Sequence, residues 1–118
     1  PTVLMRIVDT ALYGNAYPLE EMVDDLTAAI FSADIEGTVN GFRRNLQMEY
    51  VQRLVAIVGV PGKSDYDTSA RGIALLQLLN LRDTLVSHES QDAMTRAHRQ
   101  LLVITIDHAL DREMREQS

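Results

Sequence analysis

The sequence predicts an all-α fold, a helical bundle of about five helices, three long and two short. Apolar residues recur at steps of three and four along nearly the whole chain, which is the spacing of one face of an α-helix. Aromatic residues make up only 5% and Trp is absent, a balance that suits packed helices better than a β-sandwich. The 118 residues match the commonest size of one domain, so we expect a single helical domain over residues 1–118.

Composition and charge exclude several classes of function. The formal charge is −6, from 17 acidic and 11 basic residues, whereas nucleic-acid binders gain most of their affinity from Lys and Arg. We therefore expect no nucleic-acid partner. Cys is absent, which rules out disulfides and cysteine metal sites. No apolar run approaches the ~20 residues that span a bilayer, and no signal peptide is visible. Because the chain begins at Pro1 rather than Met, we expect it to be a piece of a longer protein.

The first part of the chain predicts two helices separated by a turn. The first is short and covers residues 4–11. Gly14 and Asn15 end it, because both tolerate positive φ at a helix C-terminus. Pro18 opens the second helix in the first turn, where its missing N–H costs nothing. The apolar stripe of the second helix comprises Leu19, Met22, Val23, Leu26 and Ile30.

Three longer helices are expected to follow, with loops over residues 32–37, 59–65 and 88–90. The stripe of the third helix, over residues 38–58, comprises Phe42, Leu46, Tyr50, Leu54 and Ile57. The fourth helix is capped by Asp67 or Thr68, and its seam comprises Ala74, Leu78, Leu81 and Leu85. The last helix is capped by Ser90 or Asp92. Its expected buried seam comprises Met94, Ala97, Leu101 and Ile104, broadened by Leu102 and Ile106.

The segment His88-Glu89-Ser90-Gln91-Asp92 contains the first half of a metallopeptidase motif. In H-E-x-x-H two His one helical turn apart bind one zinc ion, and the Glu acts as general base. Asp92 stands where the second His belongs, and the sequence places no third ligand. The simpler interpretation is a connection into the last helix. We therefore assign no catalytic and no metal-binding residue. His88 and Asp92 are kept as less favoured candidates for metal ligands.

Two further histidines and an acidic cluster have structural interpretations. His98 and His108 are ten residues apart on the last helix, too far to share one ion. We expect His108 at the edge of the core and His98 exposed or flanking the core. Paired carboxylates can perform acid–base chemistry, but a solvated helix face is the simpler expectation for Glu20, Glu21, Asp24 and Asp25.

Arg43 and Arg44 lie on the third predicted helix, with Glu49 and Arg53 at ion-pair spacing. One interpretation is a surface face with salt bridges. The other is an Arg pair that docks on the carboxylates of another domain, because guanidinium groups bind carboxylates bidentately. Arg43, Arg44 and Gln47 are therefore our candidates for an interdomain contact.

Three stretches occur in a distinctive order. Residues 13–31 begin Tyr13-Gly14-Asn15-Ala16-Tyr17-Pro18, residues 43–54 begin Arg43-Arg44-Asn45-Leu46-Gln47, and Ala70-Arg71-Gly72 precedes a Leu-rich helix. This combination resembles the C-terminal region of large bacterial met-zincin-type zinc metallopeptidases. The resemblance runs roughly from Leu4 to Leu110 and rests on order and spacing, because none of the stretches is chemically diagnostic.

The resemblance implies a non-catalytic C-terminal helical domain that packs against the protease domain and shapes its substrate cleft. In that family an extended H-E-x-x-H motif lies in a preceding domain, and no position of this chain matches it. The zinc cofactor therefore belongs to the parent protein, not to this chain. The implied partners are the rest of the same polypeptide and, through it, a peptide or protein substrate. The implied location is the periplasm, the cell surface or the medium.

Two other interpretations stay open. One is a free-standing helical module that binds a partner helix or dimerises through a groove rich in Met and Leu. The other is a small metal-binding bundle that uses His88 and Asp92 with His98 or His108. Bundle metal sites usually take their ligands from E-x-x-H pairs on facing helices, and the sequence contains none.

Overall fold

The computed structural model describes residues 19–31, 40–59, 68–88 and 90–117. All regular structure in these residues is helical, which confirms the predicted all-α class. The helices are α2 (Leu19–Phe31), α3 (Gly41–Val58), α4 (Thr68–Ser87) and α5 (Ala93–Gln117). The short helix predicted over residues 4–11 lies outside the described residues, as do the loop over 32–37 and most of that over 59–65.

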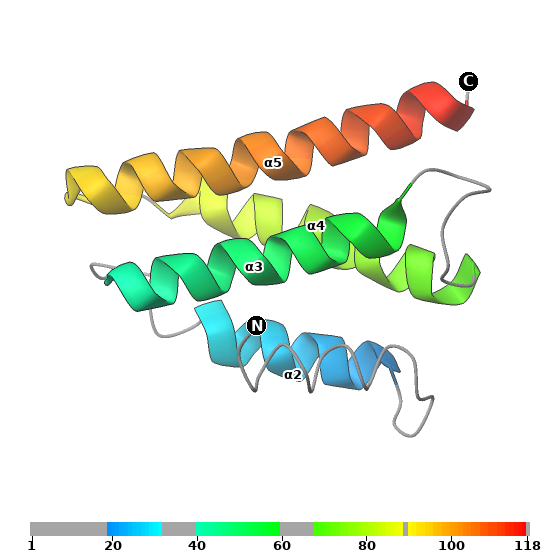
Figure 1. The fold of residues 1–118 in the computed structure, drawn as a ribbon, viewed down its shortest axis with the longest axis horizontal. Helices are drawn as coiled ribbons and strands as arrows, with labels where there is room; N and C mark the ends of the chain where they lie inside the picture. The colour runs from blue at the N-terminus through cyan, green and yellow to red at the C-terminus, as the bar shows by residue number, and fades with distance from the viewer. Residues whose placement is uncertain (1–18, 32–39, 60–67, 89, 118) are drawn as a thin grey trace.

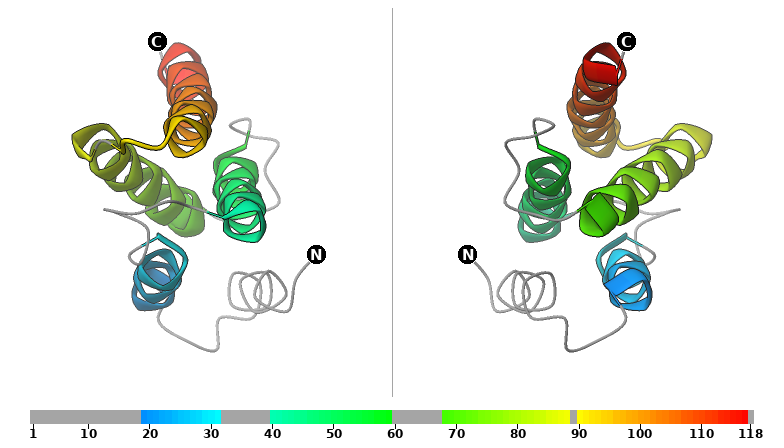
Figure 2. Two further views of the ribbon diagram at one scale, coloured as in Figure 1. Left: turned by 90° about the vertical axis from the view of Figure 1, so that its left-hand side faces the viewer. Right: turned by 90° about the vertical axis from the view of Figure 1, so that its right-hand side faces the viewer.

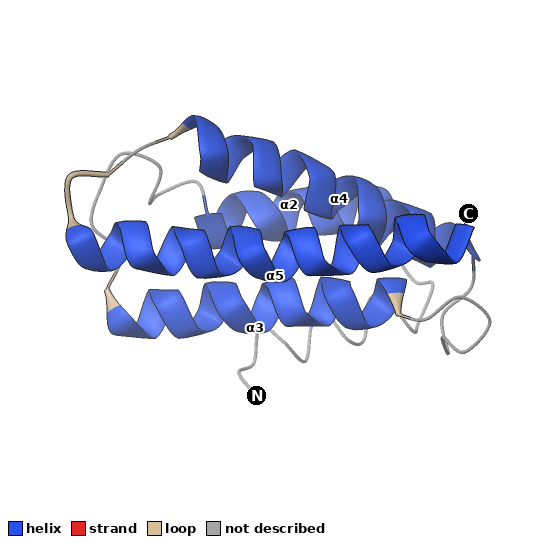
Figure 3. Cartoon of the chain, turned by 90° about the horizontal axis from the view of Figure 1, so that it is seen from above, coloured by secondary structure: helices blue, strands red, loops and turns tan. Residues whose placement is uncertain are grey.

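The four helices alternate in direction along the chain. In Figures 1 and 3, α3 and α5 run the same way side by side, and α4 runs the opposite way. Each of these three helices packs on the other two. Figure 2 shows α2 on the far side of α3 and α4 from α5, and α2 packs on both of them. Alternating directions are expected where neighbouring helices are joined by short connections.

The core takes most of its residues from the apolar stripes predicted for α2, α3 and α4, and the rest from α5. Leu26 and Leu85 of those stripes are half-buried, and the side chains of Leu19 and Met22 lie outside the described part of the chain. The largest members of the core, each almost fully buried, are Ile30, Tyr50, Leu54, Ile57, Leu78, Leu81, Leu102 and Ile106. Phe42 departs from the prediction: it lies in the first turn of α3 and is 72% exposed. The buried stripe of α3 therefore begins one turn later, at Leu46.

The buried face of α5 is only in part the one that the sequence predicts: Leu102 and Ile106, expected to broaden the seam, are fully buried, but the seam itself is not. Met94, Leu101 and Ile104 are 60%, 56% and 63% exposed, and Ala97 is exposed as well. The buried side chains lie roughly a third of a turn around the helix, and they are Thr95, His98, Arg99, Leu102, Ile106, Ala109 and Glu113. The polar members of this face have hydrogen-bond partners within the chain, so they can be buried at low cost. Met94, Ala97, Leu101 and Ile104 thus form an exposed apolar stripe.

Arg71 ties three helices together at one end of the bundle. Its Nε donates to the carbonyl oxygen of Val58, the last residue of α3, at 2.8 Å. Its Nη2 pairs with the carboxylate of Glu113 on α5 at 3.2 Å. Near the middle of the same two helices, Arg82 of α4 pairs with Asp107 of α5. These contacts fix the position of α5 against α4.

Tyr50 forms a buried polar contact between α2 and α3. Its hydroxyl lies 2.7 Å from Thr27 Oγ1 and donates to the Val23 carbonyl oxygen at 3.2 Å. The ring is fully buried and packs on Phe31, with 6.4 Å between the ring centroids. Burial disfavours the phenolate and raises the pKa of Tyr50 to about 12, although the hydrogen bond from Thr27 opposes this.

We expect alkaline pH to destabilise the fold through Tyr50. The unfolded tyrosine ionises near its usual pKa of 10 and the folded one near 12, so stability falls as pH rises between these values. The expected slope is about 1.4 kcal/mol per pH unit. Urea unfolding of the wild type and of Tyr50→Phe across this range measures it. Tyr50→Phe should lose this component of the slope, and equal slopes would show that the phenol ionises freely in the fold.

Candidate functional site

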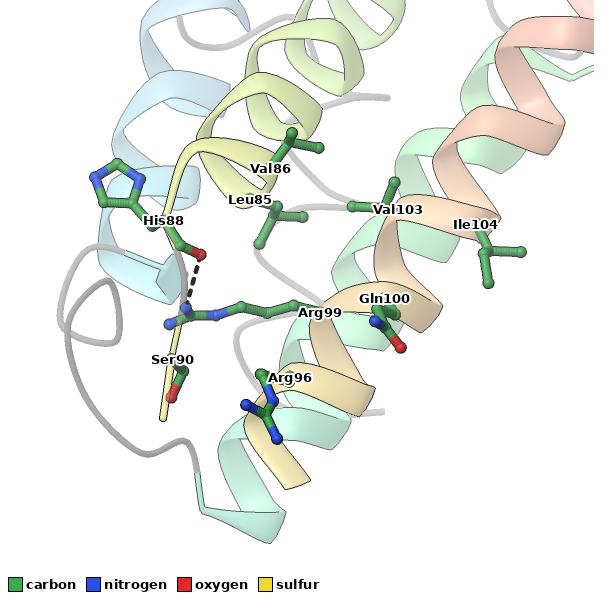
Figure 4. A pocket seen from close by; sticks show the side chains of 9 residues that line it. All are labelled: Leu85, Val86, His88, Ser90, Arg96, Arg99, Gln100, Val103 and Ile104. Carbon is green, nitrogen blue, oxygen red and sulfur yellow. Dashed lines mark hydrogen bonds between the residues drawn. The ribbon is translucent and has the colours of Figure 1, made fainter. Parts of the chain in front are cut away.

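A cavity lies between the end of α4 and the first half of α5 (Figure 4). Its volume is about 550 Å³, within the range of sites that hold small molecules or side chains. Its apolar lining comprises Leu85, Val86, Val103 and Ile104, and its polar lining comprises His88, Ser90, Arg96, Arg99 and Gln100. Ile104 also belongs to the exposed stripe, so the cavity and the stripe adjoin.

Asp92 fixes the start of α5 beside the cavity. Its Oδ2 accepts hydrogen bonds from the Thr95 backbone N–H at 2.8 Å and from the Thr95 hydroxyl at 2.7 Å. Ser90 Oγ accepts from the Asp92 backbone N–H at 3.2 Å. The hydrogen bonds from Thr95 hold the pKa of Asp92 below its usual value. Asp92 is thus the N-cap, one of the two capping residues predicted for this helix.

His88 and Arg99 close the connection between α4 and α5. His88 Nδ1 lies 2.9 Å from the Thr84 carbonyl oxygen, to which it donates, at the C-terminal end of α4. Arg99 Nη1 donates to the His88 carbonyl oxygen at 3.2 Å, the contact dashed in Figure 4. The guanidinium of Arg99 is therefore held at a fixed place in the cavity wall.

His88 and Asp92, the two less favoured candidates for metal ligands, both take part in helix capping. Among the residues that the structure describes, no group of three His, Cys, Asp or Glu side chains is arranged to hold a metal ion. His98 is buried, although the sequence predicts it exposed or flanking the core, and His108 is exposed rather than at the edge of the core. The reason is the rotation of α5, which turns His98 towards α3. Asp24 and Asp25 of the acidic cluster are exposed.

Gln47, one of the interdomain candidates, makes its contacts inside this chain. It is 2% exposed, its Nε2 donates to the Ile30 carbonyl oxygen at 3.2 Å, and its Oε1 lies 2.8 Å from His98 Nε2. Gln47, which lies on α3, thus links the C-terminal end of α2 to α5. The spacing of Gln47 with Val51, Leu54 and Val58 is a signal that could have placed it on the buried face.

Arg43 and Arg44, the other two candidates, are half-buried at the start of α3. Arg43 Nη1 donates to the Ala29 carbonyl oxygen at 3.2 Å, so its guanidinium covers the C-terminal end of α2. Arg44 lies close enough to Asp92 to lower the pKa of that carboxylate. Both side chains therefore interact first with neighbouring helix ends of this chain.

Comparison with protein-family models, curated proteins and solved structures found no significant match for this chain. Among the described helices, none combines the length and apolar character needed to cross a membrane.

Proposed function

We propose that this chain is a non-catalytic helical domain of a zinc metallopeptidase, and that it docks on the protease domain through α5. The docking surface is the α5 stripe, which we define as Met94, Ala97, Leu101 and Ile104. The observation that carries the docking part of the proposal is the exposure of this stripe. Soluble monomers rarely leave large contiguous apolar patches open to water.

The stripe has the geometry of a helix-packing surface. Its residues follow steps of three, four and three, so they lie on one face of α5 over three turns. Three of the four are large and more than half exposed. The exposed Val86 of α4 lies beside the same surface, across the cavity from Ile104. A partner helix could bury all of these side chains together.

The identity of the parent protein rests on the sequence resemblance. In that assignment the zinc ion and its activated water belong to the protease domain, and the present chain supplies packing surface beside the substrate cleft. The parent would act in the periplasm or outside the cell. The α5 stripe replaces Arg43, Arg44 and Gln47 as our main docking surface, because those three side chains contact helix ends of this chain.

The proposal can be tested on the product of the complete gene that encodes this chain. We expect stoichiometric zinc by atomic emission and cleavage of a casein substrate. Leu101→Glu places a charge at the centre of the docking surface, so limited proteolysis should release the helical domain on the order of 10-fold faster than in the wild type. Gln52→Glu, at an exposed position of α3, is the matched control and should leave the release rate unchanged.

Each part of the proposal has its own contradicting outcome. A gene product without zinc and without peptidase activity would contradict the assignment of the parent protein as a metallopeptidase. Equal rates of release of the helical domain from Leu101→Glu and Gln52→Glu would contradict docking through the α5 stripe.

A second candidate function is self-association through the same stripe. Steps of three and four repeated over three turns are also the pattern of a two-helix seam. Sedimentation of the 118-residue chain separates the two. A dimer that Leu101→Glu dissociates would favour self-association, whereas a monomer at high micromolar concentration would favour docking on another domain.

A further inference from the structure

We propose that the cavity between α4 and α5 binds a polypeptide segment in which an aliphatic side chain adjoins a carboxylate. This inference rests on the proposed docking role and names the chemistry of the partner segment. Three features of the cavity carry it: its open aliphatic wall, its cationic rim and its size.

The aliphatic wall is only partly covered by this chain. Val86 and Ile104 are 56% and 63% exposed, and Leu85 and Val103 are half-buried beside them. Removing such apolar surface from water is favourable. A volume of about 550 Å³ has room for a few aliphatic side chains. The wall therefore favours an apolar ligand group.

The rim of the cavity is cationic in an acidic chain. Among the described residues that line the cavity, two are Arg and none is Asp or Glu, although the chain carries 17 acidic and 11 basic residues. Arg96 and Arg99 are one helical turn apart on α5, and Arg99 is anchored by its bond to the His88 carbonyl. The Asp92 carboxylate, whose pKa Arg96 helps to lower, accepts two hydrogen bonds from Thr95.

The aliphatic wall and the cationic rim together determine which ligand the cavity favours. A carboxylate can pair with the exposed guanidinium of Arg96, a charge-assisted contact that a neutral amide makes less well. A free inorganic anion would leave the aliphatic wall open, and a purely apolar segment would bring no group for the rim. An Asp or Glu next to Leu, Val or Ile satisfies both.

The inference can be tested by NMR titration of the ¹⁵N-labelled chain with three short peptides. The probe is acetyl-Leu-Val-Glu-Leu-amide, and the controls are the same peptide with Gln for Glu and the same peptide with Ser for each aliphatic residue. We expect saturable shifts of amides in residues 85–104 with the probe. Both controls should bind on the order of 10-fold more weakly. Arg96→Gln should weaken the probe by a similar factor, whereas Arg115→Gln, at an exposed position far along α5, should not.

Equal affinity for the Glu and Gln peptides would overturn the assignment of a carboxylate. Shifts centred outside the cavity, or none up to millimolar probe, would overturn the site itself. Circular dichroism of Arg96→Gln checks that the fold is intact. Neither outcome affects the docking of the α5 stripe, which is measured on the complete gene product and does not depend on any peptide.

Discussion

Leu102→Ala should lower the free energy of unfolding by about 3–4 kcal/mol, whereas Leu101→Ala should change it by less than about 1 kcal/mol. The two leucines are neighbours in sequence and identical in chemistry. Leu102 is fully buried on α5 and Leu101 is 56% exposed. Truncating a fully buried leucine removes apolar burial and leaves a cavity, but truncating an exposed one leaves neither.

Urea unfolding monitored by circular dichroism gives both values. Ile106→Ala and Ile104→Ala repeat the comparison one turn further along, because Ile106 is fully buried and Ile104 is 63% exposed. If Leu101→Ala and Ile104→Ala proved the more costly pair, α5 would face the bundle with the stripe that the sequence predicts. The proposed docking surface would then not exist.

Gln47→Leu should lower the free energy of unfolding by about 2–4 kcal/mol. The amide of Gln47 bonds both the Ile30 carbonyl and the His98 ring in the interior. Leucine has a similar volume but replaces neither hydrogen bond: the His98 ring loses Gln47, and the Ile30 carbonyl keeps the longer bond from Arg43 Nη1 at 3.5 Å. Losing a partner in the interior costs about 1–3 kcal/mol for each group. Gln52→Leu, at an exposed position of the same helix, is the matched control and should lie within about 0.5 kcal/mol of the wild type.

A double-mutant cycle with His98→Leu tests whether the loss comes from the Gln47–His98 contact. When both polar partners are replaced by apolar side chains, the double variant should be less destabilised than the sum of the two single variants. Strict additivity would mean that the two side chains do not interact across the core.

The helices themselves follow from sequence because their determinants are local. Leu78 and Leu81 repeat with helical spacing on α4, and Asp92 can cap α5 through a residue three positions away. The rotation of α5 has no such local determinant. The run through Met94, Leu101 and Ile104 is as apolar as the face that is buried. What decides between them is long-range pairing, such as the bond of His98 to Gln47, which lies 51 residues earlier.

The cavity could not be predicted from the sequence for a related reason. Its wall combines the last turn of α4, the connection after it and the first half of α5, and these segments meet only when the two helices pack together. The incomplete H-E-x-x-H motif at His88 lies in the connection between α4 and α5 that lines part of the cavity, but the motif is one of metal sites. In the fold, His88 and Asp92 stabilise helix ends, and the residues that give the cavity its charge are Arg96 and Arg99.

The docking of the α5 stripe is tested most directly by cysteine labelling at Ile104. The natural chain contains no Cys, so Ile104→Cys introduces a single thiol at a site that is 63% exposed. Its rate of reaction with a maleimide is measured in the 118-residue chain and, by mass spectrometry of the labelled peptide, in the complete gene product. We expect labelling on the order of 10-fold slower in the complete product, with Gln52→Cys on α3 unchanged. Equal rates at Ile104→Cys in the two proteins would contradict docking through α5.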